Sequence, residues 1–128
     1  MKRSYNPDPK PSARPRKAIR IKDPQALKQA AIVLEVCPVC KDRPGQTVHH
    51  IVPRGSPHFG DDVLANLVVL CGHGTAGCHG AVEARRGDAR QRLGEHLRHE
   101  RPDAVSYVTE KLGQEAGEAW LQRHYPTS

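Results

Sequence analysis

The chain has 128 residues, enough for one compact domain, and only 37% of them are hydrophobic, with one Phe and one Trp. So few apolar residues predict a thin core, of the kind that metals or disulfides reinforce. No apolar run reaches the ~18 residues of a membrane span, and the N-terminus has no apolar stretch like that of a secretory signal. We therefore expect a cytoplasmic protein without a membrane partner, in which four cysteines are metal ligands before they are disulfides.

The positive charge is concentrated near the N-terminus. The net charge is +6, and residues 1–22 hold eight basic residues and one acid (+7), whereas residues 23–128 hold twelve and thirteen (−1). A Pro-rich segment of this kind cannot bury enough surface to fold alone, and such arms commonly track a phosphate backbone. We interpret residues 1–22 as a basic disordered arm that contacts DNA, with a solubilising tail as the alternative. The candidate DNA contacts in it are Arg14, Arg16, Lys17, Arg20 and Lys22.

The first predicted elements are a helix and a hairpin. Asp23 and Pro24 would begin the helix, and apolar residues at helical spacing carry it to about Val36. A cysteine-containing turn at 37–45 then leads to strands expected at 47–49 and 66–70. The loop of residues 53–62, with two prolines and two glycines, separates the strands and has the length of a functional loop.

Helical patterns fill the remainder of the chain. They are predicted at 79–86, ended by Gly87, then at 88–100, and then at 102–125 with Gly113 and Gly117 as candidate breaks. The last of these segments contributes apolar residues that we interpret as core: Val105, Val108, Leu112, Trp120 and Leu121.

The four cysteines form two pairs that predict a structural zinc site. Cys37 and Cys40 have the two-residue spacing of a zinc knuckle. Cys71 and Cys78 are separated by six residues, a longer spacer that its three glycines make conformationally easy. The alternatives are buried free cysteines, or His73 in place of Cys71 or Cys78 as a ligand.

Three separated segments of the chain resemble the HNH endonuclease family. They are His49-His50-Ile51-Val52-Pro53, then residues 66–71, then Cys78-His79-Gly80. The resemblance spans roughly residues 37–86, and the cysteine pairs fall where the zinc-bearing branch of the family has them. The glycine-rich stretch 71–80 is similar in particular to small HNH proteins of actinobacterial phages. The resemblance implies an α+β fold with a ββα-metal core, and a nuclease that cuts or nicks DNA with one divalent ion such as Mg²⁺, Mn²⁺ or Ni²⁺.

The residues of these segments suit phosphodiester hydrolysis, which needs a deprotonated water and a cation to stabilise the developing charge. Consecutive residues of a strand point to opposite sides, so His49 and His50 must have different tasks. By resemblance, His49 and His79 bind the catalytic ion and His50 is the general base. Glu83 lies one helical turn after His79 and is either a third metal ligand or a surface charge.

Other candidates surround this group. By resemblance, Asn66 holds the loop and the orientation of the base through side-chain hydrogen bonds to the backbone. Arg54 follows the base closely and is a candidate contact to the scissile phosphate. His58, Asp61 and Asp62 lie in the loop between the strands, where any of them could touch metal or DNA.

The sequence thus predicts an α+β protein with a ββα-metal core and a four-cysteine zinc site, flanked by an N-terminal helix and C-terminal helices. We divide it into the arm (1–22), an HNH nuclease domain (23–100) and a C-terminal helical extension (101–128). A phage-encoded enzyme would act in the host cytoplasm, as a monomer or as a homodimer if it breaks both strands. Two other classes compete: a non-catalytic zinc-stabilised DNA-binding module, and an interaction module that binds phage packaging proteins.

Overall fold

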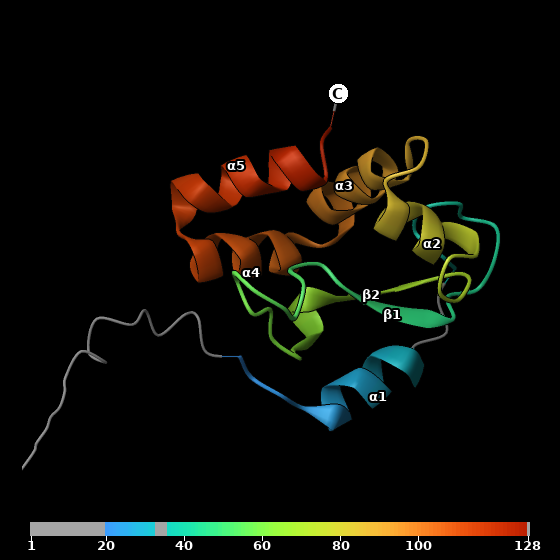
Figure 1. Cartoon of the computed structure of the whole chain (residues 1–128), viewed down its shortest axis with the longest axis horizontal. Helices are drawn as coiled ribbons and strands as arrows, with labels where there is room; N and C mark the ends of the chain where they lie inside the picture. Colours follow the sequence, from blue (N-terminus) through green and yellow to red (C-terminus); the bar gives the residue numbers. More distant parts are fainter. Residues whose placement is uncertain (1–19, 33–35, 128) are drawn as a thin grey trace, which may run out of the picture.

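The computed structural model of the chain describes residues 20–32 and 36–127. A two-stranded antiparallel hairpin lies between one helix on one side and the remaining helices on the other (Figure 1). This arrangement confirms the predicted α+β fold, with a hairpin followed by a helix. In chain order the elements are α1 (Pro24–Ile32), β1 (Thr47–His50), the 3-10 turn η3 (Leu64–Asn66), β2 (Leu67–Leu70), α2 (Gly77–Ala84), α3 (Ala89–Glu100), α4 (Pro102–Leu112) and α5 (Gln114–His124).

The two faces of the hairpin pack against different partners. Leu67 packs with Ala26 and Ala30 of α1, whereas Val68 and Leu70 belong to the larger core formed with the other helices. Because side chains alternate along a strand, this division assigns each residue of β1 to a face. His49 pairs with Val68 and His50 with Leu67, so the two histidines face opposite sides of the hairpin, as expected.

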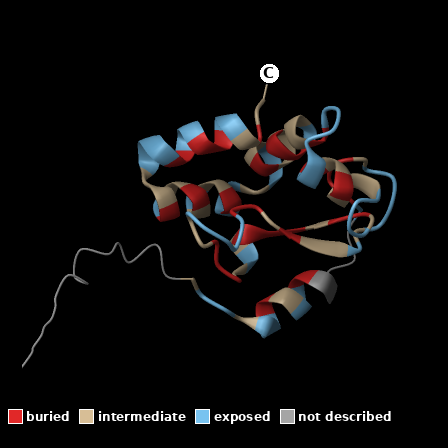
Figure 2. Ribbon diagram, in the orientation of Figure 1, coloured by how far each residue is buried: buried red, intermediate tan, exposed pale blue. Residues whose placement is uncertain are grey.

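The larger core runs without interruption from the cysteines to the C-terminal helices. It joins Val82 of α2, Leu93 and Leu97 of α3, Val108 of α4 and Leu121 of α5. The buried stripes of these helices face one another in Figure 2. The C-terminal helices therefore share one hydrophobic core with the helical face of the hairpin.

Several predicted boundaries are wrong by a few residues. The helix that we expected to reach about Val36 is α1, described over Pro24–Ile32; residues 33–35 lie outside the described residues, and Val36 itself forms a β-bridge with Pro44. Asn66 lies in the turn before β2 and not in the strand. Helix α2 begins at Gly77 and is closed by Arg85, whose left-handed backbone (φ 58°) takes the place that we gave to Gly87.

The C-terminal segment breaks once. Gly113, at φ 99°, separates α4 from α5, whereas Gly117 is buried inside α5. Val108, Trp120 and Leu121 are buried as predicted, and Val105 and Leu112 pack partly buried against the same core. None of the helices in the described part of the chain has the length and apolar character needed to cross a membrane.

Close backbone approaches fix two parts of the fold that matter for the site. A Cβ on Gly94 would lie 2.3 Å from the carbonyl oxygen of Tyr125, so only glycine lets the chain after α5 return against α3. A Cβ on Gly60 would lie 1.8 Å from the carbonyl oxygen of Val52, which holds the end of the 53–62 loop against the chain after β1.

Candidate functional site

The four cysteines lie together in one cluster. One sulfur atom from each lies within 4.8 Å of every other, and the Sγ atoms of Cys40 and Cys71 are 3.9 Å apart. Four zinc–sulfur bonds of about 2.3 Å in a tetrahedron place the sulfurs about 3.8 Å apart. The cluster is free of disulfides. Its donor set and spacing therefore fit a structural zinc ion, as the sequence predicted.

The local backbone around the first pair is that of a metal knuckle. The N–H of Lys41 donates to the carbonyl of Cys37 at 2.8 Å. Burial by itself would raise the pKa of Cys40, but the backbone N–H groups of Arg43 and Asp42 lower it to about 7. This thiol is therefore ready to bind a cation as thiolate.

The second pair behaves differently because it is surrounded by sulfur. Burial, followed by the neighbouring thiols, raises the pKa of Cys78 far above its usual value, and burial also raises the pKa of Cys71. Four thiolates this close repel one another unless a cation lies between them. His73 stays outside the cluster: it is exposed, and its Nδ1 lies 3.2 Å from Thr47 Oγ1.

A second group of metal-binding side chains lies on the helical face of the hairpin. It joins His49 of β1 to His79 and Glu83 of α2, with one ligand atom of each within 4.8 Å of the others. His49 Nδ1 lies 2.9 Å from Glu83 Oε2. His49 is buried, at 5% exposed, whereas the Glu83 side chain is 54% exposed. Two imidazoles and one carboxylate are a donor set that divalent ions bind, and the exposed carboxylate leaves the group open to a substrate.

In each of the two histidines, the ring nitrogen that points away from the metal-binding group makes a hydrogen bond to another part of the protein. Tyr125 Oη lies 2.9 Å from His49 Nε2 and 3.0 Å from the carbonyl oxygen of Ile51. Because a carbonyl can only accept, the hydroxyl donates to Ile51 and accepts from His49 Nε2–H, which leaves Nδ1 as the metal-binding nitrogen. His79 Nδ1–H donates to the carbonyl of Gly74 at 3.0 Å and leaves Nε2. Such outer contacts are typical of metal-ligating histidines.

His50 lies on the other face of β1 with a carboxylate partner. Its Nε2 lies 2.8 Å from Asp62 Oδ1, and Asp62 also binds Arg20 and the backbone N–H of Asp23. Burial alone would raise the pKa of Asp62, but the hydrogen bonds from His50 and Asp23 and the charge of Arg20 bring it below its usual value. An ionised Asp62 can only accept, so the Nε2 of His50 carries the proton.

The pKa of His50 lies below its usual value, chiefly because the ring is partly buried. Burial lowers its pKa, Asp62 partly offsets this, and the positive charges of Arg54 and Arg20 lower it further. A neutral ring that donates Nε2–H to Asp62 keeps a lone pair on Nδ1, which can take a proton.

Asn66 is fully buried and ties the loop closed. Its Oδ1 accepts from the N–H of Val52 at 2.8 Å, and its Nδ2 donates to the carbonyls of Val52 and Asp61 at 3.1 and 3.0 Å. These bonds join the start of the loop to its end, and Asn66 does not line the cavity into which the two histidines open. It therefore shapes the backbone that follows the two histidines.

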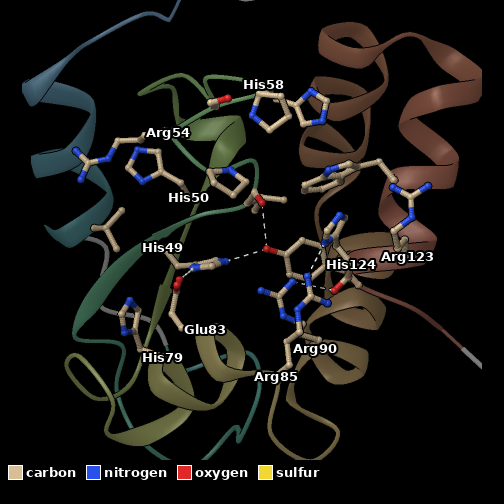
Figure 3. Close-up of a pocket in the computed structure, with 18 residues that line it drawn as sticks. His49, His50, Arg54, His58, His79, Glu83, Arg85, Arg90, Arg123 and His124 are labelled. Atoms are coloured by element: carbon tan, nitrogen blue, oxygen red, sulfur yellow. Dashed lines mark hydrogen bonds and ion pairs between the residues drawn. The ribbon is translucent and has the colours of Figure 1, made fainter.

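One cavity of about 620 Å³ brings these groups together (Figure 3). The metal-binding group and His50 line one part of it. Arg54 lines the cavity near His50, as a candidate phosphate contact should. Further basic and aromatic residues line the rest of the wall: His58, Arg85, Arg90, Trp120, Arg123 and His124.

The basic arm is only partly described. Arg14, Arg16 and Lys17 lie outside the described residues. Lys22 is exposed. Arg20 instead makes contacts within the protein, where its Nη2 binds Asp62 and its Nε donates to the carbonyl of Gly60 at 3.0 Å. This residue supports the loop, so the DNA contact that we predicted for it is not what its contacts in the structure favour.

Comparison with known protein families bears on the same segment. Residues 37–85 match the family model described as HNH endonuclease. This segment is an HNH domain. It contains both cysteine pairs, the metal-binding group and His50, and it covers less than half of the 128-residue chain. Neither the search of curated proteins nor the search of solved structures returned a match.

Three contacts of the HNH domain were missed from the sequence. Tyr125 lies 76 residues after His49 and belongs to no motif, so the sequence indicated only that it lies near the end of the C-terminal helical pattern. In the sequence, Asp61 and Asp62 are adjacent and equally plausible as contacts to metal or DNA. The structure separates them, because Asp61 binds Lys111 at 3.0 Å and the hydroxyl of Tyr107, whereas Asp62 binds His50. Gly74, which holds His79 through its backbone, has no side-chain signal.

Proposed function

We propose that the protein is a divalent-metal-dependent DNA endonuclease that nicks one strand. The observation that carries the proposal is the joint position of the His49, His79 and Glu83 group and of His50 in one cavity of the HNH domain. A single active site of this kind acts on one strand at a time, so a double-strand break would need a homodimer or two visits.

The roles of the residues follow from their contacts. His49 Nδ1, His79 Nε2 and the Glu83 carboxylate would hold a divalent ion, Mg²⁺, Mn²⁺ or Ni²⁺. Bound there, the ion would stabilise the negative charge that develops on the phosphate and the leaving oxygen. His50 accepts the proton of the attacking water at Nδ1, while Asp62 keeps its ring oriented through Nε2.

Other residues support the reaction without touching the reacting atoms. Asn66 holds the loop that follows the histidines. The four cysteines, with zinc bound, would join the turn that precedes β1 to the end of β2 and to α2. Arg54 contacts a phosphate of the substrate, and the basic residues of the arm other than Arg20, Lys22 among them, contact the DNA backbone. In this division residues 1–22 bind DNA, residues 23–100 hydrolyse the phosphodiester bond, and residues 101–128 complete the hydrophobic core.

The source and neighbours of the protein belong to the same proposal. A phage-encoded nuclease that works beside packaging proteins in the host cytoplasm is supported by the similarity of the 71–80 stretch to small phage HNH proteins, and by no contact in the structure.

Nicking of supercoiled plasmid tests the proposal. Wild-type protein is incubated with Mg²⁺, Mn²⁺ and Ni²⁺ in turn, and His50→Ala is compared with His99→Ala, an exposed histidine of α3 outside the cavity. We expect metal-dependent conversion to open circles, lost in His50→Ala and kept in His99→Ala. Binding without cutting under every metal would favour the non-catalytic DNA-binding module instead.

A further inference from the structure

The cavity wall opposite the metal-binding group is positively charged. Figure 3 shows His49, His79 and Glu83 on one side, with Arg123 and His124 of α5 across the cavity and Arg85 and Arg90 below them. Of the charged side chains that line the cavity, four are arginines and Glu83 is the one carboxylate. A concave surface with this excess of one sign concentrates anions.

The arginines on this wall differ in what they contact. Arg90 makes contacts within the protein: its Nε donates to the carbonyl of Val82 at 2.7 Å, and its guanidinium lies 5.1 Å from the ring centre of Tyr125. Arg85 Nη2 donates to Nδ1 of His124 at 2.8 Å, so that ring is a neutral acceptor. Within the described residues, neither Arg85 nor Arg123 forms an ion pair with a carboxylate.

The electrostatics of His124 reflect the same crowding. Burial lowers its pKa, and the charges of Arg85, Arg90 and Arg123 lower it further. Like charges brought together in this way repel one another, and an anion bound among them would relieve the repulsion.

The backbone of Arg85 gives independent support. It ends α2 in the left-handed region (φ 58°, ψ 42°), where glycine is the usual residue because a side chain is strained there. The side chain at this position is therefore not explained by the helix end, whereas it contacts His124, and both residues line the cavity. Strained residues of this kind are a reason to look for a ligand.

We propose that Arg85 and Arg123, with His124, form a phosphate-binding site for the DNA strand whose scissile phosphate lies at the metal-binding group. This inference rests on the proposed nuclease function and gives the C-terminal helices a part in substrate binding. The ligand is a backbone phosphodiester, which Arg85 and Arg123 contact as charged donors. The site reads no base sequence, because phosphate contacts position a strand without specifying it.

The single tryptophan of the chain reports on this site. Trp120 lines the cavity, and its ring centre lies 4.5 Å from that of His124. Its fluorescence can be followed in the zinc-loaded full chain, without added catalytic metal, while a duplex oligonucleotide or inorganic phosphate is titrated in at several salt concentrations. The variants are Arg85→Gln, Arg123→Gln and the double variant, with Arg92→Gln as control. Arg92 is an exposed residue of α3 outside the cavity, and its replacement removes one positive charge, as each single variant does.

We expect the double variant to bind duplex DNA at least ten-fold more weakly, with a slope of log affinity against log salt reduced by about 2, one for each lost phosphate contact. Arg92→Gln should bind as the wild type does. Arg85→Gly separates ligand binding from folding, because glycine suits the left-handed backbone: it should lose DNA affinity with an unchanged or raised Tm.

Three results would overturn the inference. If wild type nicks plasmid while the double variant keeps its affinity and salt slope, the phosphate site is wrong and the nuclease function stands. If the fluorescence responds to inorganic phosphate and not to DNA, the wall binds free anions and is no substrate site. If wild-type protein neither binds nor nicks DNA, the inference fails together with the proposed function.

Discussion

Removal of the Tyr125 hydroxyl should lower the metal affinity of the His49, His79 and Glu83 group although none of these three residues is changed. Tyr125 is 1% exposed, and its hydroxyl bridges His49 Nε2–H and the carbonyl of Ile51. In Tyr125→Phe both of these buried groups lose their partner, at a cost of about 1–3 kcal/mol for each unsatisfied group. We therefore expect a Tm lowered by several degrees.

The same change should reduce metal affinity by a different route. Without an acceptor at Nε2, the proton of a neutral His49 moves to Nδ1, where Glu83 accepts it at 2.9 Å. Nδ1 is the nitrogen that should bind the ion, so the affinity for Mn²⁺ should fall about 10–100-fold, the usual effect of removing an outer partner of a ligating histidine. Calorimetric titration of Mn²⁺ into zinc-loaded protein measures this directly.

Tyr107→Phe is the matched control. Tyr107 also loses a hydroxyl that bonds inside the protein, where it accepts from the N–H of Asp61 at 2.9 Å, but it does not line the cavity. It should lower the Tm and leave Mn²⁺ affinity unchanged. If Tyr125→Phe lowers the Tm and binds Mn²⁺ as tightly as the wild type, the reasoning about the His49 tautomer is refuted.

Three further predictions concern the zinc cluster, the base and the arm. Cys40→Ser should lose zinc and unfold the domain. Structural zinc contributes about 10–16 kcal/mol to folding in small zinc domains, which is comparable with the whole free energy of unfolding of a protein of this size. Metal analysis with a circular dichroism melt checks this, and a zinc-free variant with the wild-type Tm would contradict it. Asp62→Asn should slow plasmid nicking by less than the ~10²–10⁴-fold that a general base contributes, because Asn can still accept a hydrogen bond from His50 but supplies no negative charge. The affinity for Mn²⁺ should be unchanged. An unaltered nicking rate would show that Asp62 does not position His50. Deletion of residues 1–17, which spares Arg20 and its bond to Asp62, should weaken DNA affinity and flatten its salt dependence while metal binding stays intact; an unchanged salt slope would leave the arm as a solubilising tail.

The parts of the site that sequence predicted were those set by local spacing. Cys37 and Cys40 declare themselves by their spacing, and the position of His49 and His50 on opposite faces follows from the geometry of any strand. The glycines of the 71–78 loop indicated that a six-residue spacer could still close, and the structure shows that it does.

The parts that sequence missed depend on contacts between distant segments. Nothing in the spacing of Tyr125 connects it to His49, because the contact exists only once α5 returns against α3 at Gly94. Charge counting treated Arg20 as equivalent to the other basic residues of the arm. Its burial against Asp62 depends on the loop that Asn66 closes, which composition cannot reveal.

The most direct test of the account is the nicking rate of supercoiled plasmid as a function of Mn²⁺ concentration for wild type, His50→Ala and His79→Ala. If His50 is the base, its variant should be slower by about 10²–10⁴-fold at every Mn²⁺ concentration, with an unchanged half-saturation point. If His79 is a ligand, its variant should need more Mn²⁺ and recover part of its rate at high concentration. Wild-type nicking by His50→Ala, or an unchanged Mn²⁺ dependence in His79→Ala, would contradict the central claim.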